Sequence, residues 1–196
     1  HVLLAVGRRP NTDDLGLETV GLAVSARGIV PVDARLATAV PGLWAAGDIR
    51  GGPMFTHTAW DDHRILLSQL AGDGVRTTER IVPWAIFTDP ELGRVGMTEA
   101  QARADGRAIS VARFPMQRSG KAAELGEAEG FIKVVADAGT KRLLGAAVLA
   151  LDGAELVHAY VDLMNAGAPY TVLRDSVQAH PTLSEAVQSA VAALDT

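Results

Sequence analysis

The sequence has 196 residues, of which 48% are hydrophobic and 21% are charged, and its formal net charge is -5. This length and composition support one large domain or two small ones with a real core. The negative charge, with no basic run longer than Arg8-Arg9 or Lys141-Arg142, argues against a nucleic-acid partner. No apolar run approaches the ~20 residues that cross a bilayer, so no membrane partner is predicted. The absence of cysteine excludes a disulfide, a thiolate metal site and a cysteine nucleophile within this sequence.

The first segment, residues 2–6, is a continuous apolar, β-prone run that ends at Gly7. This pattern predicts a buried parallel strand. A buried strand without a methionine or a polar lead before it is typical of the middle of a domain, so we expect the C-terminal part of a longer protein. A turn-rich connector follows at residues 8–12, and residues 30–32 can add a short extended piece.

The next informative stretch is residues 38–48, where a Pro41-Gly42 turn leads into a predicted buried strand at residues 43–46. The strand ends at Gly47-Asp48, and ligands of open α/β sheets bind at the carboxyl ends of strands. Gly47 lets a ligand approach the backbone closely, and the Asp48 carboxylate can accept from a sugar-type hydroxyl. A Gly-Asp pair after a strand is also an ordinary turn, and the spacing leaves both interpretations open.

A helix is predicted from residue 54 to residue 70, with its N-terminus near Asp48. The unpaired N–H groups and positive dipole of that end suit a developing anion. His57, Asp61 and His63 lie close together on this helix. They could bind a metal only with help from another segment. We therefore interpret them as an exposed polar face and predict no metal site.

Composition changes at residues 71–80, which is the predicted domain boundary. Beyond it, strands are predicted at residues 84–87, 93–97 and 109–114, and a hairpin is predicted from strands at residues 131–136 and 143–149. Thr98 and Gln101 have capping-box spacing for a helix that ends before Gly106. The segment beyond this boundary is therefore predicted to be an α+β domain with an antiparallel sheet.

Two helices are predicted near the C-terminus, at residues 153–165 and 183–194. The first has an apolar face that is wide for one small sheet, so it packs on its own sheet or against a second subunit.

The segment between these helices contains His180 and Glu185, five residues apart. A histidine that exchanges a proton near neutral pH works better when a carboxylate fixes its tautomer. Thr182 and Glu185 also have capping-box spacing, in which Glu185 only secures the start of a helix. Spacing alone favours the structural role, and we expect Glu185 to perform one of these two tasks at a time.

These stretches together resemble the pyridine nucleotide-disulfide oxidoreductases, the flavoprotein disulfide reductases that include dihydrolipoamide dehydrogenase and mercuric reductase. Residues 4–12 look like the segment that leaves the nicotinamide-binding domain. Residues 38–48 are similar to the second FAD fingerprint, and residues 52–57 look like the helix start beneath the flavin pyrimidine ring. Residues 180–185 match the His-Pro-Thr-x-x-Glu motif of the C-terminal interface domain.

The resemblance implies a role for each matching residue. Asp48 would bind the ribityl chain of the flavin. His180 would be the acid/base that protonates a leaving thiolate, and Glu185 would orient it, both at the flavin of the partner subunit. The residues implied in FAD binding are Gly47, Asp48, Met54, Phe55 and Thr56.

The resemblance also implies the domain organisation. Residues 1–10 would end the NAD(P)-binding domain, residues 11–78 would form the C-terminal part of the FAD-binding domain, and residues 79–196 would form the interface domain of a homodimer. The fold class is therefore α/β followed by α+β. The family's redox-active cysteine pair, its first Gly-rich FAD loop and its NAD(P) loop are absent and would lie upstream of His1, so NAD(P)H would bind mostly outside this sequence.

The function implied is that of a cytoplasmic, FAD-dependent NAD(P)H oxidoreductase that acts on a small-molecule or protein disulfide, or on a related oxidant. Residues 51–62 look closer to the mercuric-reductase-like branch, which includes enzymes that resist reactive chlorine species. Mercury itself is a poor fit because the sequence has no cysteine. The alternative is a catalytically inactive dimerisation module with a partial FAD cradle.

Overall fold

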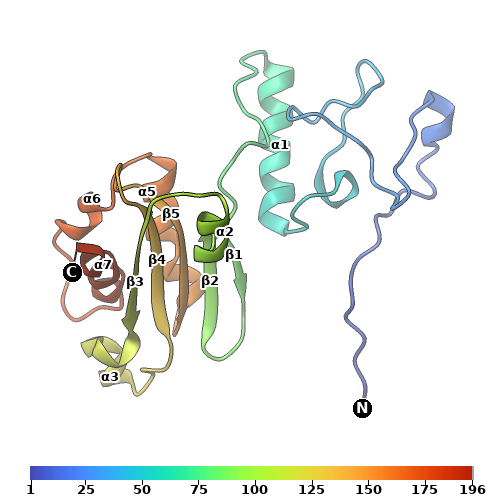
Figure 1. The fold of residues 1–196 in the computed structure, drawn as a ribbon. Helices are drawn as coiled ribbons and strands as arrows, with labels where there is room; N and C mark the ends of the chain where they lie inside the picture. Colours follow the sequence, from blue (N-terminus) through green and yellow to red (C-terminus); the bar gives the residue numbers. More distant parts are fainter. Residues whose placement is uncertain (196) are drawn as a thin grey trace. The chain divides into compact units, whose positions relative to one another are not determined.

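The computed structural model describes residues 1–195, which form two compact units that divide between Arg80 and Ile81 (Figure 1). Each unit has its own cluster of buried apolar side chains. Within the part of the chain that the structure describes, no helix combines the length and the apolar character needed to cross a membrane.

The first unit is mostly irregular and is organised around one long helix, α1 (Thr56–Ala71). Two short 3-10 helices precede it, η1 (Leu17–Val20) and η2 (Gly47–Arg50), and η2 packs against α1. The α1 helix agrees closely with the prediction of residues 54–70. It ends at Gly72, whose φ of 98° is readily adopted only by glycine.

The strand predictions for the first unit are wrong. Residues 2–6 form no strand, and Val2 and Val6 are 90% and 95% exposed. A parallel strand needs a neighbouring strand to accept its hydrogen bonds, and no described segment pairs with this one. Residues 43–46, also predicted as a strand, contribute only an isolated bridge between Ala37 and Trp44, and the short extended piece expected at residues 30–32 belongs to no strand.

The second unit contains a five-stranded antiparallel sheet with the strand order β1-β2-β5-β4-β3 (Figure 1). This confirms the predicted antiparallel sheet and its β4–β5 hairpin. Alternation along β4 explains how the sheet forms its core. Ile132, Val134 and Ala136 point to one face and are all buried. Of the residues that alternate with them on the other face, Val135 is buried and the others are partly exposed. The strands are β1 (Trp84–Ile86), β2 (Glu91–Gly96), β3 (Ile109–Pro115), β4 (Phe131–Asp137) and β5 (Leu143–Ala150).

Helices cover the buried face of the sheet: α4 packs on β2, α5 on β5, and α7 on β3 and β4. The helix predicted at residues 153–165 is divided at Val157 into α4 and α5. The capping box of Thr98 and Gln101 is confirmed at the start of α2. The α-helices are α2 (Glu99–Ala104), α3 (Gly120–Leu125), α4 (Gly153–Leu156), α5 (His158–Asn165), α6 (Thr171–Arg174) and α7 (Ser184–Ala192). Two 3-10 helices complete the unit, η3 (Met116–Arg118) and η4 (Ala193–Asp195).

Candidate active-site and cofactor-binding residues

Glu185 lies in the first turn of α7 and contacts two different groups with its two carboxylate oxygens. Its Oε1 lies 3.0 Å from Nδ1 of His180. Its Oε2 accepts a hydrogen bond of 2.8 Å from the backbone N–H of Thr182. The expectation that Glu185 performs one task at a time is therefore wrong, because each oxygen serves one task.

The capping interaction at α7 is only half of a capping box. The Thr182 hydroxyl donates to the carbonyl of Ala179 at 2.7 Å instead of capping α7, and the N-cap residue, Leu183, makes no side-chain cap hydrogen bond. The backbone contact from Thr182 still restricts the rotamer of Glu185, because it fixes one of the two oxygens. The remaining oxygen is thereby held toward the imidazole of His180.

The imidazole of His180 is open to solvent on its other side, with 78% of the side chain exposed. When Nδ1 carries the proton and donates to Glu185, the neutral ring presents Nε2 as an acceptor. The Thr182 N–H, and after it His180, hold the pKa of Glu185 below its usual range. Glu185 is therefore an anion at neutral pH.

The second candidate site joins the segments predicted to bind FAD. Asp48 lies in η2, directly after Gly47, and its side chain is exposed. Arg8 connects it to the segment before α1, since Nη1 of Arg8 donates to the carbonyl of Met54 at 2.6 Å and lies 3.4 Å from Oδ2 of Asp48. The sequence offered no reason to connect Arg8 with either residue, because they lie 40 and 46 positions apart.

The α1 N-terminus begins at Thr56, with Phe55 in the N-cap position. The Thr58 hydroxyl secures this turn, because it accepts from the Phe55 N–H at 3.2 Å and donates to the Pro53 carbonyl at 2.7 Å. Phe55 stacks on the ring of His57 at a centroid distance of 5.1 Å. Met54 and Phe55 are half-buried and Thr56 is exposed, so the turn presents backbone and side chains to a ligand.

The residues of this region fit the group that the resemblance implies. Gly47 and Gly52 flank the turn that contains Asp48 with positive φ values of 74° and 81°, and Gly52 is exposed, whereas Gly51 has positive φ but is buried against the Ile29 side chain. A carboxylate acceptor beside side-chain-free backbone suits a chain of hydroxyl groups, as in a ribityl moiety. The helix N-terminus adds positive potential for the electron-rich end of a flavin ring.

A buried ion network supports this region and was not predicted. Asp62 on α1 is 0% exposed and accepts from the Gly47 N–H at 2.8 Å. Arg50 donates to both of its oxygens at 2.6 and 2.9 Å. Arg80 donates to its Oδ1 at 2.6 Å and also to the Thr58 carbonyl at 3.1 Å. Asp62 therefore fixes the backbone of the Gly47-Asp48 turn to the middle of α1.

Burial alone would raise the pKa of Asp62. The hydrogen bonds from Arg50, the Gly47 N–H and Arg80 outweigh that effect, and the pKa is lowered. Asp62 is therefore ionised at neutral pH although it is buried, and its charge is balanced by two arginines.

Asp61, one of the three polar residues considered on α1, forms ion pairs with two arginines. Asp61 lies 2.5 Å from Nη1 of Arg80 and 3.1 Å from Nη1 of Arg64. Across residues 1–195, no group of three or more His, Cys, Asp or Glu side chains has the arrangement of a metal site.

The second unit therefore has a five-stranded antiparallel sheet with a His-Glu pair at the start of α7, and the first unit has a Gly-Asp turn in η2. The family model for the pyridine nucleotide-disulphide oxidoreductase dimerisation domain matches residues 82–191. A second model, pyridine nucleotide-disulphide oxidoreductase, matches residues 1–62. The chain belongs to the pyridine nucleotide-disulphide oxidoreductase family.

Individual relatives agree with this assignment. The chain is 41% identical over 188 residues to the probable pyridine nucleotide-disulfide oxidoreductase RclA of Escherichia coli, covering 95% of this chain and 43% of the relative. It is 41% identical over 195 residues to a dihydrolipoyl dehydrogenase of Cupriavidus necator, covering 100% of this chain and 41% of the relative. The chain therefore spans less than half the length of these relatives.

Solved structures show the same fold. A structure of the HOCl-induced flavoprotein disulfide reductase RclA from Escherichia coli superposes with a TM-score of 0.91 at 40% identity, covering 96% of this chain and 44% of that one. LpdA from Mycobacterium tuberculosis superposes with a TM-score of 0.92 at 27% identity, covering 98% and 42%. The predicted family and fold class are thereby confirmed, as are FAD and NAD(P)H as the cofactors of the family.

Proposed function

We propose that this chain supplies the acid/base pair and part of the FAD cradle of an FAD-dependent NAD(P)H oxidoreductase that acts on a disulfide or a related oxidant. The observation that carries the proposal is the divided carboxylate of Glu185, which secures the start of α7 with one oxygen and His180 with the other. A carboxylate with a purely structural role has no need of the imidazole. The arrangement orients an exposed histidine at a fixed position.

His180 would move the proton in this reaction. Nδ1 stays bonded to Glu185, and Nε2 gives a proton to a departing thiolate and takes it back in the reverse direction. The flavin, when bound, would supply the electron transfer. Asp48 and the glycines around it would hold the ribityl chain, and Met54, Phe55 and Thr56 would lie against the flavin ring.

Residues 79–196, which contain the second unit, would form a homodimer. The match to a dimerisation domain supports this proposal, and so does the exposure of several apolar side chains on this unit. Examples are Phe87 at 80%, Val172 at 56% and Val177 at 98% exposed. We further propose that the whole enzyme is cytoplasmic and that His180 acts on the flavin of the partner subunit.

The test is the variant His180→Gln in the full-length enzyme. Positioned proton transfer contributes about 10²- to 10⁴-fold, so turnover with a disulfide substrate should fall by a factor in that range. His158→Gln is the matched control, because His158 is an exposed histidine on α5 of the same unit. Glu185→Gln should give a smaller loss, with a changed pH profile. Turnover of H180Q within a few-fold of the unmodified enzyme would exclude the acid/base role.

The alternative function is an inactive dimerisation module with a partial FAD cradle. It is favoured by the absence of cysteine, since the chain contains no thiol that could exchange with a disulfide. It predicts no NAD(P)H oxidation by the 196-residue chain with added FAD, and a dimeric mass in light scattering. Robust turnover by this chain would refute the alternative. The alternative describes this chain and the first proposal describes the whole enzyme, so both can hold.

A further inference from the structure

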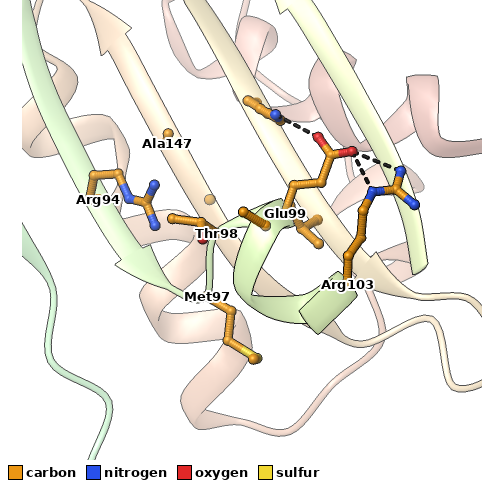
Figure 2. A pocket seen from close by; sticks show the side chains of 10 residues that line it. Arg94, Met97, Thr98, Glu99, Arg103 and Ala147 are labelled. Carbon is orange, nitrogen blue, oxygen red and sulfur yellow. Dashed lines mark hydrogen bonds and ion pairs between the residues drawn. The ribbon is translucent and has the colours of Figure 1, made fainter. Parts of the chain in front are cut away.

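The second unit contains a cavity of about 450 Å³ between α2 and the partly exposed face of the sheet (Figure 2). Val135 and Ala147 contribute to its floor from the sheet, and α2 with the residues before it forms one wall. Figure 2 shows Arg94 at one side of the cavity and Glu99 with Arg103 at the other. This cavity lies in a different unit from the proposed flavin cradle, and the proposed function does not use it.

Strand register explains why a hollow exists at this place. Arg94 on β2 and Lys133 on β4 are both paired with Ala147 on β5, so the three residues form one row across the sheet. Side chains paired in this way project from the same face. The outer two strands lie roughly 9–10 Å apart. The methyl group of Ala147 is too short to fill the space between two long cationic side chains.

The charges around the cavity do not balance. Both oxygens of Glu99 are already engaged, since Arg103 lies 2.7 Å from Oε1 and Lys133 lies 2.7 Å from Oε2. These two partners, Lys133 first, lower the pKa of Glu99 and keep it ionised. One carboxylate thus faces three cations once Arg94 is included, which leaves an excess of positive charge at the cavity.

Arg94 is the cation that has no acidic partner. Among residues 1–195 it forms no ion pair, its Nε is buried without a hydrogen-bond partner, and Nη2 makes one long contact of 3.4 Å to the Gly96 carbonyl. Its guanidinium lies 5.8 Å from the ring centroid of Trp84. Burial disfavours the charged guanidinium and lowers the pKa of Arg94. A charge in this condition gains from an anion more than an exposed one does.

We propose that this cavity binds a small organic carboxylate, with its head group on the Nη atoms of Arg94 and its apolar body over Ala147. The guanidinium supplies paired donors that match the geometry of a carboxylate. The remaining lining favours hydrocarbon, because Met97, Ala100 and Val135 surround the floor. An inorganic anion would pair with the Arg94 guanidinium but leave this apolar surface exposed to water. It therefore fits the cavity less well than an organic carboxylate does.

The test uses the ¹⁵N-labelled 196-residue chain and follows the Nε–H resonance of Arg94 by NMR. Hexanoate is the probe, and hexanol, sodium chloride and inorganic phosphate at matched ionic strength are the comparisons. We expect hexanoate to shift the Arg94 signal saturably, with a Kd on the order of millimolar, as suits a ligand of this size. Hexanol, chloride and phosphate should leave the signal within a small fraction of that shift.

Three variants locate the site. Ala147→Leu should abolish the binding because it fills the hollow, and Arg94→Gln, followed at backbone amides of β5, should weaken it about tenfold or more. Arg113→Gln is the control, since Arg113 is an exposed cation paired with Lys133 in the same row and does not line the cavity. It should bind hexanoate normally.

Several outcomes would overturn the proposal. If hexanol shifts the Arg94 resonance as much as hexanoate does, the cavity binds apolar molecules without selecting for negative charge. If chloride or phosphate shifts it equally, the effect is general electrostatic screening. Unchanged hexanoate affinity in Arg94→Gln would remove Arg94 from the site. If Ala147→Leu does not fold, the Arg94→Gln comparison still decides the matter, because that change removes charge and leaves the sheet register intact.

Discussion

Replacing Asp62 by asparagine tests whether the buried ion network stabilises the first unit. Asp62 accepts four hydrogen bonds, from the Gly47 N–H, from two atoms of Arg50 and from Arg80. Asparagine has the same shape but only one acceptor oxygen, so its NH₂ group would face at least one arginine donor. The side chains of Arg50 and Arg80 are only 9% and 15% exposed and cannot turn fully to water.

The magnitude follows from removing one partner of a buried ion pair, which costs about 3–5 kcal/mol. Native-state hydrogen exchange measures this locally, and we expect exchange of the α1 amides to accelerate roughly 10²- to 10⁴-fold or to lose protection completely. The β4 amides belong to the other unit and should be unaffected. Asp61→Asn is the control, because Asp61 is the adjacent, partly exposed carboxylate, and it should cost less than about 1 kcal/mol.

The pH dependence of this effect has a defined sign. The folded pKa of Asp62 is lowered, so its contribution is complete above the unfolded value of about 3.9 and is lost as pH falls through the folded value. The difference between Asp62→Asn and the unmodified chain should therefore shrink below about pH 4. A three-fold or smaller change in α1 exchange at neutral pH, or an equal change from Asp61→Asn, would refute the reasoning.

Two further changes probe the second unit by chemical unfolding. Gly93→Ala would place a Cβ 2.1 Å from the Gly153 carbonyl oxygen, a backbone atom, and should lower the free energy of unfolding by about 1–3 kcal/mol or more. Gly120→Ala is the control: its Cβ would have no atom within 4 Å, and the free energy of unfolding should change by less than about 0.5 kcal/mol. Tyr160→Phe removes the buried hydroxyl that donates to the Val187 carbonyl at 2.9 Å and should cost about 1 kcal/mol; no loss would show that this link between α5 and α7 is energetically neutral.

Local pattern was enough to predict the second unit. Two short apolar, β-prone runs at residues 131–136 and 143–149, separated by a polar turn, predicted a hairpin, and the structure pairs these segments as neighbouring antiparallel strands. The Thr98–Gln101 box also formed, because a capping box depends only on residues three apart. Both features are decided within a short window, where sequence spacing and spatial distance agree.

The failures occurred where the outcome depends on distant segments. Residues 2–6 have the composition of a buried strand, but burial requires neighbouring strands, and the described chain pairs none with them. Asp62 meets Arg50 and Arg80, which lie 12 and 18 positions away, and periodicity carries no information about such pairs. The hollow over Ala147 likewise depends on the register of three strands, which no single segment specifies.

The two readings of His180 and Glu185 could not be separated by spacing, and the structure shows why. A capping carboxylate and an orienting carboxylate both belong in the first turn of α7, and a carboxylate has two oxygens to divide between them. The backbone N–H of Thr182 selects the rotamer of Glu185, and that rotamer determines where the second oxygen meets the imidazole. The helix start is thus the support that holds His180 in position, so any change that disturbs the beginning of α7 should also change how the imidazole is oriented.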